Sequence, residues 1–315
     1  MNLYVNSSPH IRDSRTTQSL MLDVLIALVP ALLASVYIFG TRSLLITAVT
    51  VAACVFFEYI SSRIKGTPSY LNNLSAVVTG VLLAYNMPSS IPLWIPVLGS
   101  LIAIVVIKEL FGGIGTNFAN PAIAARIVLV LSYPIEMNNF TVKARWAAVG
   151  STGTGDLVSS ATPLSLKAAG EFVPNTMRLF LGQHAGVIGE VCGAALLIGL
   201  AYLLFRRVIT AWIPVTFVGS VAIMALLTNN DPIFSMLSGG LLLGAIFMAT
   251  DYVTSPDSLK GKIIFGVGCG VITGLIRFFG AIPEGVSYAI LIMNLMTPTI
   301  NKYTMVKPIG GVKHA

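Results

Sequence analysis

The chain has 315 residues, of which 55% are apolar and only 10% are charged, with a formal net charge of +7. Soluble domains carry about 25% charged residues, so this composition excludes disorder, a coiled coil and almost any soluble enzyme. The three cysteines lie far apart inside apolar stretches, which excludes a disulfide framework and a zinc-binding spacing. We therefore expect a polytopic membrane protein.

Ten apolar segments follow one another along the chain, most of them near the ~20 residues that cross a bilayer. The predicted fold class is an all-α integral membrane protein with about ten transmembrane helices, some of them broken. No small-residue cleavage site follows the first segment, which indicates an uncleaved helix. The segments lie at residues 21–39, 42–62, 71–87, 91–109, 118–134, 185–205, 210–227, 233–253, 261–279 and 284–301.

The basic residues are distributed unevenly between the two sides that these segments define. If the N-terminus is cytoplasmic, twelve Lys and Arg lie on the cytoplasmic side and six on the other, four of the six within the long loop 135–184. Basic loops stay in the cytoplasm, so both termini are expected there and the loop outside. The surplus of basic residues thus indicates orientation, and no nucleic-acid partner is expected.

The long loop separates two halves with a similar pattern. Each fifth segment is interrupted by polar residues and proline, at Asn117-Phe118-Ala119-Asn120-Pro121 and at Asn294-Leu295-Met296-Thr297-Pro298. Because five is odd, the second repeat is inverted, and paired broken segments in inverted repeats point to a midplane site. The predicted parts are a cytoplasmic segment 1–20, a first repeat 21–134, the extracytoplasmic loop 135–184, a second repeat 185–304 and a cytoplasmic tail 305–315.

The loop contains the run Asp156-Leu157-Val158-Ser159-Ser160-Ala161-Thr162-Pro163. A threonine directly before a proline is typical of a helix N-cap. The Thr162 hydroxyl is equally able to accept a phosphoester bond, beside helix-start amides that suit a phosphate. The residues alone leave both interpretations open.

The pattern Asp-x-x-Ser-x-Ala-Thr resembles the motif at which a flavin transferase esterifies FMN through its phosphate to a threonine. The surrounding chain resembles a family of membrane proteins that includes the D subunit of the Rnf ferredoxin:NAD oxidoreductase complex and, more distantly, the B subunit of the sodium-pumping NADH:quinone oxidoreductase. Leu157 and Ser160 depart from the usual pattern, but neither is the acceptor. Further landmarks are Gly112-Gly113-Ile114-Gly115-Thr116-Asn117-Phe118-Ala119-Asn120-Pro121-Ala122, Arg206-Arg207, Phe247-Met248-Ala249-Thr250-Asp251 and Pro283-Glu284-Gly285-Val286-Ser287-Tyr288.

This resemblance implies covalent FMN on Thr162, with Asp156, Ser159, Ser160 and Ala161 completing the flavinylation motif. It implies a component of a translocase-type oxidoreductase in the bacterial cytoplasmic membrane, moving electrons between ferredoxin and NAD while Na⁺ or H⁺ is transported. The implied partners are the other Rnf subunits (A, B, C, E and G), a flavin transferase and membrane lipid. The chain shows no ferredoxin, NAD or Fe–S site and no catalytic residue of its own.

The alternative function is a solute or ion transporter of inverted-repeat architecture without a redox cofactor, because such repeats with broken helices also describe permeation pathways. The run from Asp156 to Thr162 discriminates between the two, since a permease does not need it. A nucleotide hydrolase is excluded, because the glycines at 150–155 lack the Lys-Ser/Thr of a P-loop.

Asn117 and Asn120 flank the break before Pro121, and two roles are open for them. Their amides can satisfy the backbone groups that a broken helix frees. The more distant resemblance implies instead contact with a second, non-covalent flavin such as riboflavin.

Three carboxylates, Asp23, Glu58 and Glu190, lie deep within predicted segments. Ionisable groups there are costly and are functional candidates by default, so these residues are candidates for an ion pathway. Structural pairing with Arg126 is the role we favour. The three histidines form no cluster, and no metal site is expected.

Overall fold

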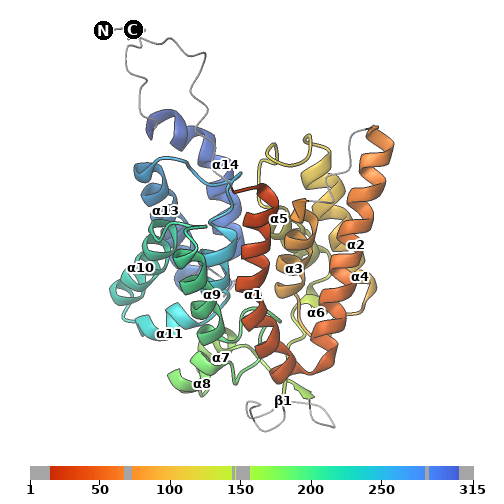
Figure 1. Ribbon diagram of the computed structural model, residues 1–315. Coiled ribbons are helices and arrows are strands. Elements are labelled where there is room, and N and C mark those ends of the chain that lie inside the picture. The colour runs from red at the N-terminus through yellow and green to blue at the C-terminus, as the bar shows by residue number, and fades with distance from the viewer. Residues whose placement is uncertain (1–14, 67–72, 144–145, 147–156, 281–283, 305–315) are drawn as a thin grey trace, which may run out of the picture.

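The computed structural model describes residues 15–66, 73–143, 146, 157–280 and 284–304. Asp156 of the flavinylation motif lies outside these residues. The first half consists of helices, the fourth of which continues as a π-helix (Figure 1). Its elements are α1 (Thr17–Phe39), α2 (Thr41–Lys65), α3 (Ser75–Tyr85), α4 (Trp94–Leu101), η2 (Ile102–Glu109) and α5 (Pro121–Ser132).

The connecting region and the second half follow. The connection holds α6 (Pro134–Met137), β1 (Thr141–Lys143), β2 (Leu157–Ser159), α7 (Pro163–Ala168) and α8 (Thr176–Leu181). The second half holds α9 (Gly193–Phe205), α10 (Trp212–Leu227), α11 (Pro232–Leu237), α12 (Leu241–Leu243), the π-helix η4 (Gly244–Met248), α13 (Leu259–Phe279) and α14 (Val286–Thr304).

Every predicted apolar segment contains helix, so the chain is mostly helical as expected. The all-α prediction is incomplete, because β1 and β2 form a two-stranded antiparallel ribbon that pairs Val142 with Val158. Three-residue strands inside a polar loop give too short an alternation for the sequence to reveal them.

Among the described residues, three helices are long and apolar enough to cross a membrane, namely α1, α2 and α13. The helices α3, α5, α9 and α10 are apolar but shorter. The eighth predicted segment, 233–253, is broken into α11, α12 and η4. Irregular backbone at membrane depth is tolerated where it is buried in protein or lines a cavity.

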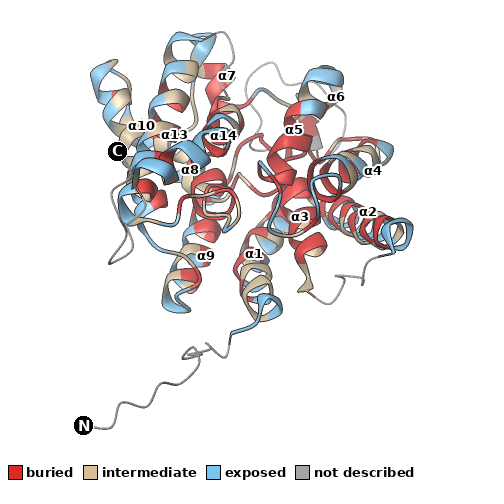
Figure 2. Ribbon diagram, turned by 90° about the horizontal axis from the view of Figure 1, so that it is seen from above, coloured by how far each residue is buried: buried red, intermediate tan, exposed pale blue. Residues whose placement is uncertain are grey.

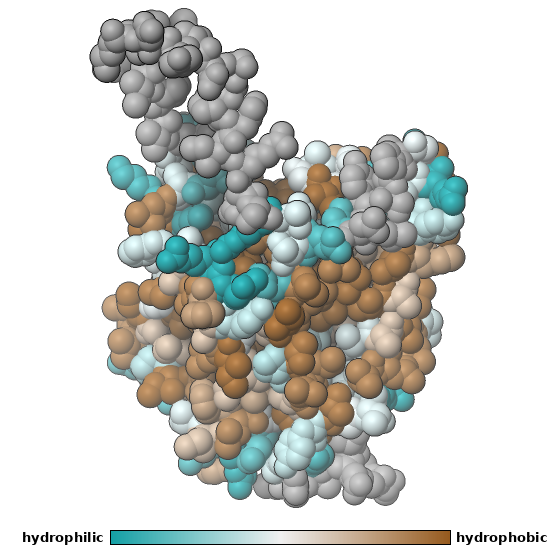
Figure 3. Space-filling model, viewed as in Figure 1, coloured by the Kyte–Doolittle hydropathy of each residue, from teal (hydrophilic) through white to brown (hydrophobic). Residues whose placement is uncertain are grey.

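The outward surface of the helices is apolar, and their inward surface carries small and polar side chains. On α1, the exposed residues Leu22, Ile26 and Leu33 recur at helical spacing, whereas Asp23 and Ser35 are buried. Figure 2 shows the buried residues gathered along the centre of the molecule, and Figure 3 shows a broad hydrophobic belt between hydrophilic ends. This distribution fits a hydrocarbon surrounding rather than water.

Small residues bring the helices close together. Three glycines of α13, Gly266, Gly270 and Gly274, face α10, and a Cβ on Gly270 would overlap the Ser220 hydroxyl. In α9, a Cβ on Gly199 would lie 2.5 Å from the carbonyl oxygen of Ala27 in α1. Stripes of small residues are the usual means of helix association in a membrane, because they let the backbones approach.

The two halves are also joined by backbone hydrogen bonds between the end of α3 and the segment that leads into α9. Gly189 N–H donates to the carbonyl of Tyr85 at 2.9 Å, and Ile188 N–H donates to that of Met87 at 3.0 Å. A Cβ on Gly189 would overlap the Tyr85 side chain, and the Tyr85 hydroxyl donates to the carbonyl of Leu28 at 2.8 Å. The end of α3 and the segment leading into α9 therefore satisfy each other's backbone.

The helical body has two ends, which are visible in Figure 1. One holds β1, α7 and α8 and is called the loop end; the other holds the beginning of α1 and the end of α14 and is called the terminal end. The part of the loop 135–184 that the structure describes thus lies opposite the outer ends of the first and last helices.

Candidate functional sites

Thr162 caps the N-terminus of α7 at the loop end. Its Oγ1 accepts a hydrogen bond from Ser165 N–H at 3.3 Å and lies 2.6 Å from the Ser165 hydroxyl oxygen. The N-cap interpretation is therefore confirmed. This cap argues against a phosphate site formed by free helix-start amides, because the Ser165 amide already donates to Thr162 and α7 is only six residues long.

A cavity of about 580 Å³ lies beside Thr162. This volume falls within the roughly 300–1,000 Å³ of small-molecule sites. Its walls are mostly apolar and aromatic, with a few polar groups, as such sites usually are. The lining residues are Arg126, Ile127, Val130, Leu131, Pro134, Met137, Asn138, Phe140, Ala161, Thr162, Ser165, Glu284, Ser287 and Tyr288.

The other motif residues support the backbone that carries Thr162. Ser159 Oγ donates to Asn139 Oδ1 at 3.1 Å, and Ser160 N–H donates to the carbonyl of Phe140 at 3.0 Å. Ala161 separates the 580 Å³ cavity from a second one of about 460 Å³, which Ser160, Arg178 and His184 help to line. Burial lowers the pKa of His184 below its usual value, so its imidazole is neutral at pH 7.

Arg126 pairs with Glu284, which belongs to a landmark of the resemblance but was not predicted to be its partner. Its Nη2 lies 2.6 Å from Glu284 Oε2, and its Nη1 donates to Ser287 Oγ at 2.5 Å. The expected pairing with Asp23 or Glu58 is wrong. Asp23 instead pairs with Arg206 at 3.2 Å, because α1 packs on α9.

Glu58 belongs to a buried cluster between α2, α3 and η2. Lys108 forms an ion pair with Glu58 and donates to Ser75 Oγ at 2.6 Å. The exposed fractions of Glu58 and Lys108 are 1% and 3%. The Glu58 carboxylate is therefore already compensated by a cation of the protein itself.

Glu190 lies at the junction between the loop end and α9. A Cβ on Gly240 would lie 3.1 Å from its Oε2, so glycine allows this carboxylate to approach the backbone before α12. Its charged neighbours are Glu284, Arg126 and Arg277. Of the three carboxylates, Glu190 is thus the one near Arg126.

Asn120 caps α5 and reaches across to the second half. Its Oδ1 accepts from Ala122 N–H at 3.0 Å and from Ile123 N–H at 3.4 Å. Its Nδ2 donates to the carbonyl of Met248, at the end of η4, at 3.3 Å. Asn117 donates to the carbonyl of Ala119 at 3.1 Å. These bonds are the structural role predicted for the two amides.

The tenth predicted segment meets the fifth at this point. Its predicted break at 294–298 is wrong, because α14 runs without interruption from Val286 to Thr304 and accommodates Pro298 inside the helix. With the Asn294 amide oriented so that both of its atoms are satisfied, its oxygen accepts from Asn120 N–H at 3.1 Å and its nitrogen donates to the carbonyl of Thr254 at 3.3 Å. Thr297 Oγ1 donates to the same carbonyl at 2.8 Å. The sequence pattern paired these two polar runs, and the structure brings them into contact.

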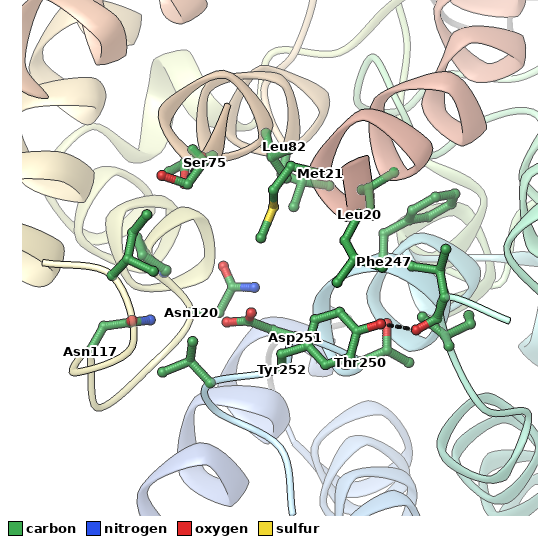
Figure 4. A pocket seen from close by; sticks show the side chains of 18 of the residues that line it. Leu20, Met21, Ser75, Leu82, Asn117, Asn120, Phe247, Thr250, Asp251 and Tyr252 are labelled. Carbon is green, nitrogen blue, oxygen red and sulfur yellow. Dashed lines mark hydrogen bonds between the residues drawn. The ribbon is translucent and has the colours of Figure 1, made fainter. Parts of the chain in front are cut away.

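A small cavity of about 100 Å³ adjoins this contact and is lined by both halves (Figure 4). Asn117 and Asn120 lie on one side of it, and Thr250, Asp251 and Tyr252 lie near them. Both π-helices contribute to the lining, η2 through Lys108 and η4 through Phe247, and such helices occur frequently at functional sites.

Sequence reasoning missed Ser75, Lys108 and Tyr252 as residues of this cavity. Lys108 was counted among the cytoplasmic basic residues, because a lysine at the end of an apolar segment usually snorkels to the interface. Its burial depends on Glu58 from a neighbouring helix, which the local sequence does not reveal.

The fold and the sites define a polytopic helical membrane protein. Its outward surface is apolar, and its helices are partly broken. Residues from both halves of the chain line the cavities of about 580 Å³ and about 100 Å³. The NQR2, RnfD, RnfE family matches residues 4–310. The chain belongs to this family.

Similar proteins match over nearly their whole length. The D subunit of a Na(+)-translocating ferredoxin:NAD(+) oxidoreductase complex from Acetobacterium woodii is 46% identical over 99% of this chain and 97% of its own. The D subunit of a proton-translocating ferredoxin:NAD(+) oxidoreductase complex from Clostridium ljungdahlii is 37% identical over 95% and 94%. The D subunit of an ion-translocating oxidoreductase complex from Ectopseudomonas mendocina is 35% identical over 98% and 96%.

Proposed function

We propose that the chain is the D subunit of an ion-translocating ferredoxin:NAD⁺ oxidoreductase (Rnf) complex of the bacterial cytoplasmic membrane, and that it passes electrons through FMN attached to Thr162. The near-complete coverage of the relatives supports the assignment to the complex. The single observation that carries the cofactor assignment is that Thr162 lines a cavity of about 580 Å³.

The residues present fit a flavin. Thr162 is the hydroxyl-bearing residue at the end of the motif. In the attachment step its oxygen bonds to the phosphorus of the FMN part of an activated donor, a flavin dinucleotide held by the transferase, the P–O bond to the nucleoside monophosphate leaving group breaks, and the hydroxyl proton is lost. Aromatic walls from Phe140 and Tyr288 suit a flat ring system and exclude water. The bound cofactor supplies one- and two-electron chemistry, which the protein positions and tunes.

The alternative of a transporter without a cofactor leaves the run from Ser159 to Thr162 and its cavity without a purpose. The two alternatives predict opposite results when the denatured protein is illuminated on a gel, since only covalent flavin survives denaturation. We expect ultraviolet fluorescence from wild-type protein made with its complex and flavin transferase. We expect none from Thr162→Ala, whereas Ser165→Ala, which keeps the acceptor, fluoresces. A dark wild-type band supports the transporter.

A second, non-covalent flavin such as riboflavin is the further cofactor proposed, at Asn117 and Asn120. The contributions of both halves to this cavity support it. The cavity of about 100 Å³ is smaller than the usual ligand site, so binding there requires the cavity to widen. The assignment is tested by extracting free flavin from the purified wild-type complex and from the Asn120→Leu complex and comparing the amounts.

The inverted repeat and the orientation complete the proposal. The placement of Asn120 against Asn294 supports two related halves, and the separation of the loop end from the terminal end supports cytoplasmic termini with the flavin outside. Among the ion-pathway candidates, Asp23 and Glu58 each have a cationic partner. Glu190 is therefore the candidate we place first.

A further inference from the structure

Arg126 is a deeply placed cation on the wall of the Thr162 cavity. Its side chain is 9% exposed and projects from the middle of α5, where its sequence neighbours are buried and apolar. Among the described residues that line this cavity, Arg126 and Glu284 carry the charges. Because a cation at membrane depth is costly, its location at a ligand-sized cavity is informative.

The two terminal nitrogens of the Arg126 guanidinium have hydrogen-bond partners, but its Nε has none. Nη1 donates to Ser287 and Nη2 to Glu284, so both of these contacts come from the beginning of the α14 region. Nε is buried and has no hydrogen-bond partner. A guanidinium has five N–H donors, and a buried donor without a partner is unfavourable. Structural pairing alone therefore accounts for this arginine only in part.

A second buried arginine, Arg277, also has a buried Nε without a hydrogen-bond partner, so the two arginines differ in the partners of their terminal nitrogens. Arg277 is bonded through both of its terminal nitrogens to the backbone carbonyls of Ser235, Ser238 and Gly239. It lines a different cavity, of about 210 Å³, and braces the backbone before α12. Arg126 has side-chain partners instead, both of which also line the Thr162 cavity.

We propose that Arg126 is a positioning residue for the flavin on Thr162 and that its positive charge favours the reduced flavin. This role rests on the proposed attachment of FMN to Thr162. Reduction places negative charge on the flavin ring, and charges near the ring tune its electronics. Inside a cavity of low dielectric constant, a fixed cation stabilises such charge more strongly than it does in water.

The test compares the flavin midpoint potential in variants of the whole complex. Because Arg126→Met alone leaves Glu284 unpaired, the test variant is Arg126→Met with Glu284→Gln. Its midpoint potential is compared with that of Glu284→Gln alone, so that the two differ only in the positive charge. The matched control removes another ion pair, as Lys65→Met with Glu109→Gln, since that pair lines neither flavin cavity. Arg126→Lys keeps the charge, and Arg126→Gln, in the same Glu284→Gln background, is a second variant of similar size.

The signal of interest is isolated by subtracting the spectrum of the Thr162→Ala complex from that of each variant during a redox titration. In-gel fluorescence of the denatured band measures attachment independently. We expect the test variant to keep its fluorescence but to lose at least tenfold in the equilibrium constant for one-electron reduction, a fall of about 59 mV. Arg126→Gln should behave likewise, whereas Arg126→Lys and the control pair should titrate near wild type.

An unchanged potential in the test variant and in Arg126→Gln, with full fluorescence, contradicts the inference and leaves Arg126 a structural role. An equal fall in the control pair also contradicts it. Absence of fluorescence from wild type overturns the proposed attachment itself, and is thereby distinguished from failure of Arg126 alone.

Discussion

The side-chain oxygen of Asn294 accepts a hydrogen bond from the backbone N–H of Asn120 at 3.1 Å, across the boundary between the two halves of the chain. Asn120 also caps α5 and donates to the carbonyl of Met248. Both asparagines are almost completely buried. The backbone amide that precedes α5 thus finds its hydrogen-bond acceptor in the other half of the chain, because no preceding helical turn supplies one.

Replacement of Asn120 should therefore loosen this junction. Asn120→Leu leaves the amides of Ala122 and Ile123 and the carbonyl of Met248 without partners, at a cost of about 1–3 kcal/mol. We expect a lower Tm in detergent and at least tenfold less non-covalent flavin in the extract. Asn120→Ser keeps a capping oxygen, so its Tm and its content of non-covalent flavin should lie between those of wild type and of Asn120→Leu. Covalent flavin on Thr162 should persist, and its loss in Asn120→Leu would mean that the two sites are coupled.

The contact between Gly189 and Tyr85 should tolerate no side chain. Gly189→Ala places a methyl group inside the Tyr85 side chain, and overpacking of this kind typically costs about 1–3 kcal/mol. Gly219→Ala in α10 is the matched control, because nothing lies within 4 Å of its new Cβ and alanine favours a helix. Thermal unfolding should separate the two variants, and equal melting temperatures would contradict the close approach.

The buried pair of Glu58 and Lys108 should respond differently to single and double replacement. Lys108→Met leaves the Glu58 carboxylate buried without its cation, which typically costs about 3–5 kcal/mol. Lys108→Met with Glu58→Gln removes both charges and should recover most of the Tm. A double variant as unstable as the single one would show that Lys108 is needed for more than pairing.

Orientation is open to direct labelling. Ala169, after α7, and Thr210, between α9 and α10, are both exposed. In a Cys192→Ala background, in which the remaining native cysteines are buried, Ala169→Cys should react with an impermeant thiol reagent in intact cells. Thr210→Cys should react only after permeabilisation. The reverse pattern would place the flavin on the cytoplasmic side.

Features that depend on local sequence were predictable. The apolar segments, the N-cap at Thr162 and the helix start after Asn120 each follow from residues close together in the chain. The break predicted at 294–298 was wrong, because α14 is continuous and accommodates Pro298. The pairing of Asn120 with Asn294 followed from their equivalent positions in the halves.

Features that depend on which helices are neighbours were not predictable. Arg126 was assigned the wrong partners because its partner, Glu284, lies far away in the sequence. No local pattern indicates that these two segments are neighbours. From the sequence, Lys108 resembles an interfacial lysine, because the sequence does not show that Glu58 lies beside it. The cavity at Thr162 is formed by α5, α6, α7 and the beginning of α14, a combination that no local pattern specifies.

The most direct test of the proposed attachment is mass spectrometry of the peptide that contains Thr162, from protein produced with its complex and flavin transferase. We predict a mass increase equal to FMN less one water, located on Thr162 by fragmentation. The same peptide from Thr162→Ala should carry no addition. An unmodified Thr162 in the wild-type complex, or FMN located on Ser159, Ser160 or Ser165 instead, would contradict the assignment of this threonine as the flavin attachment site.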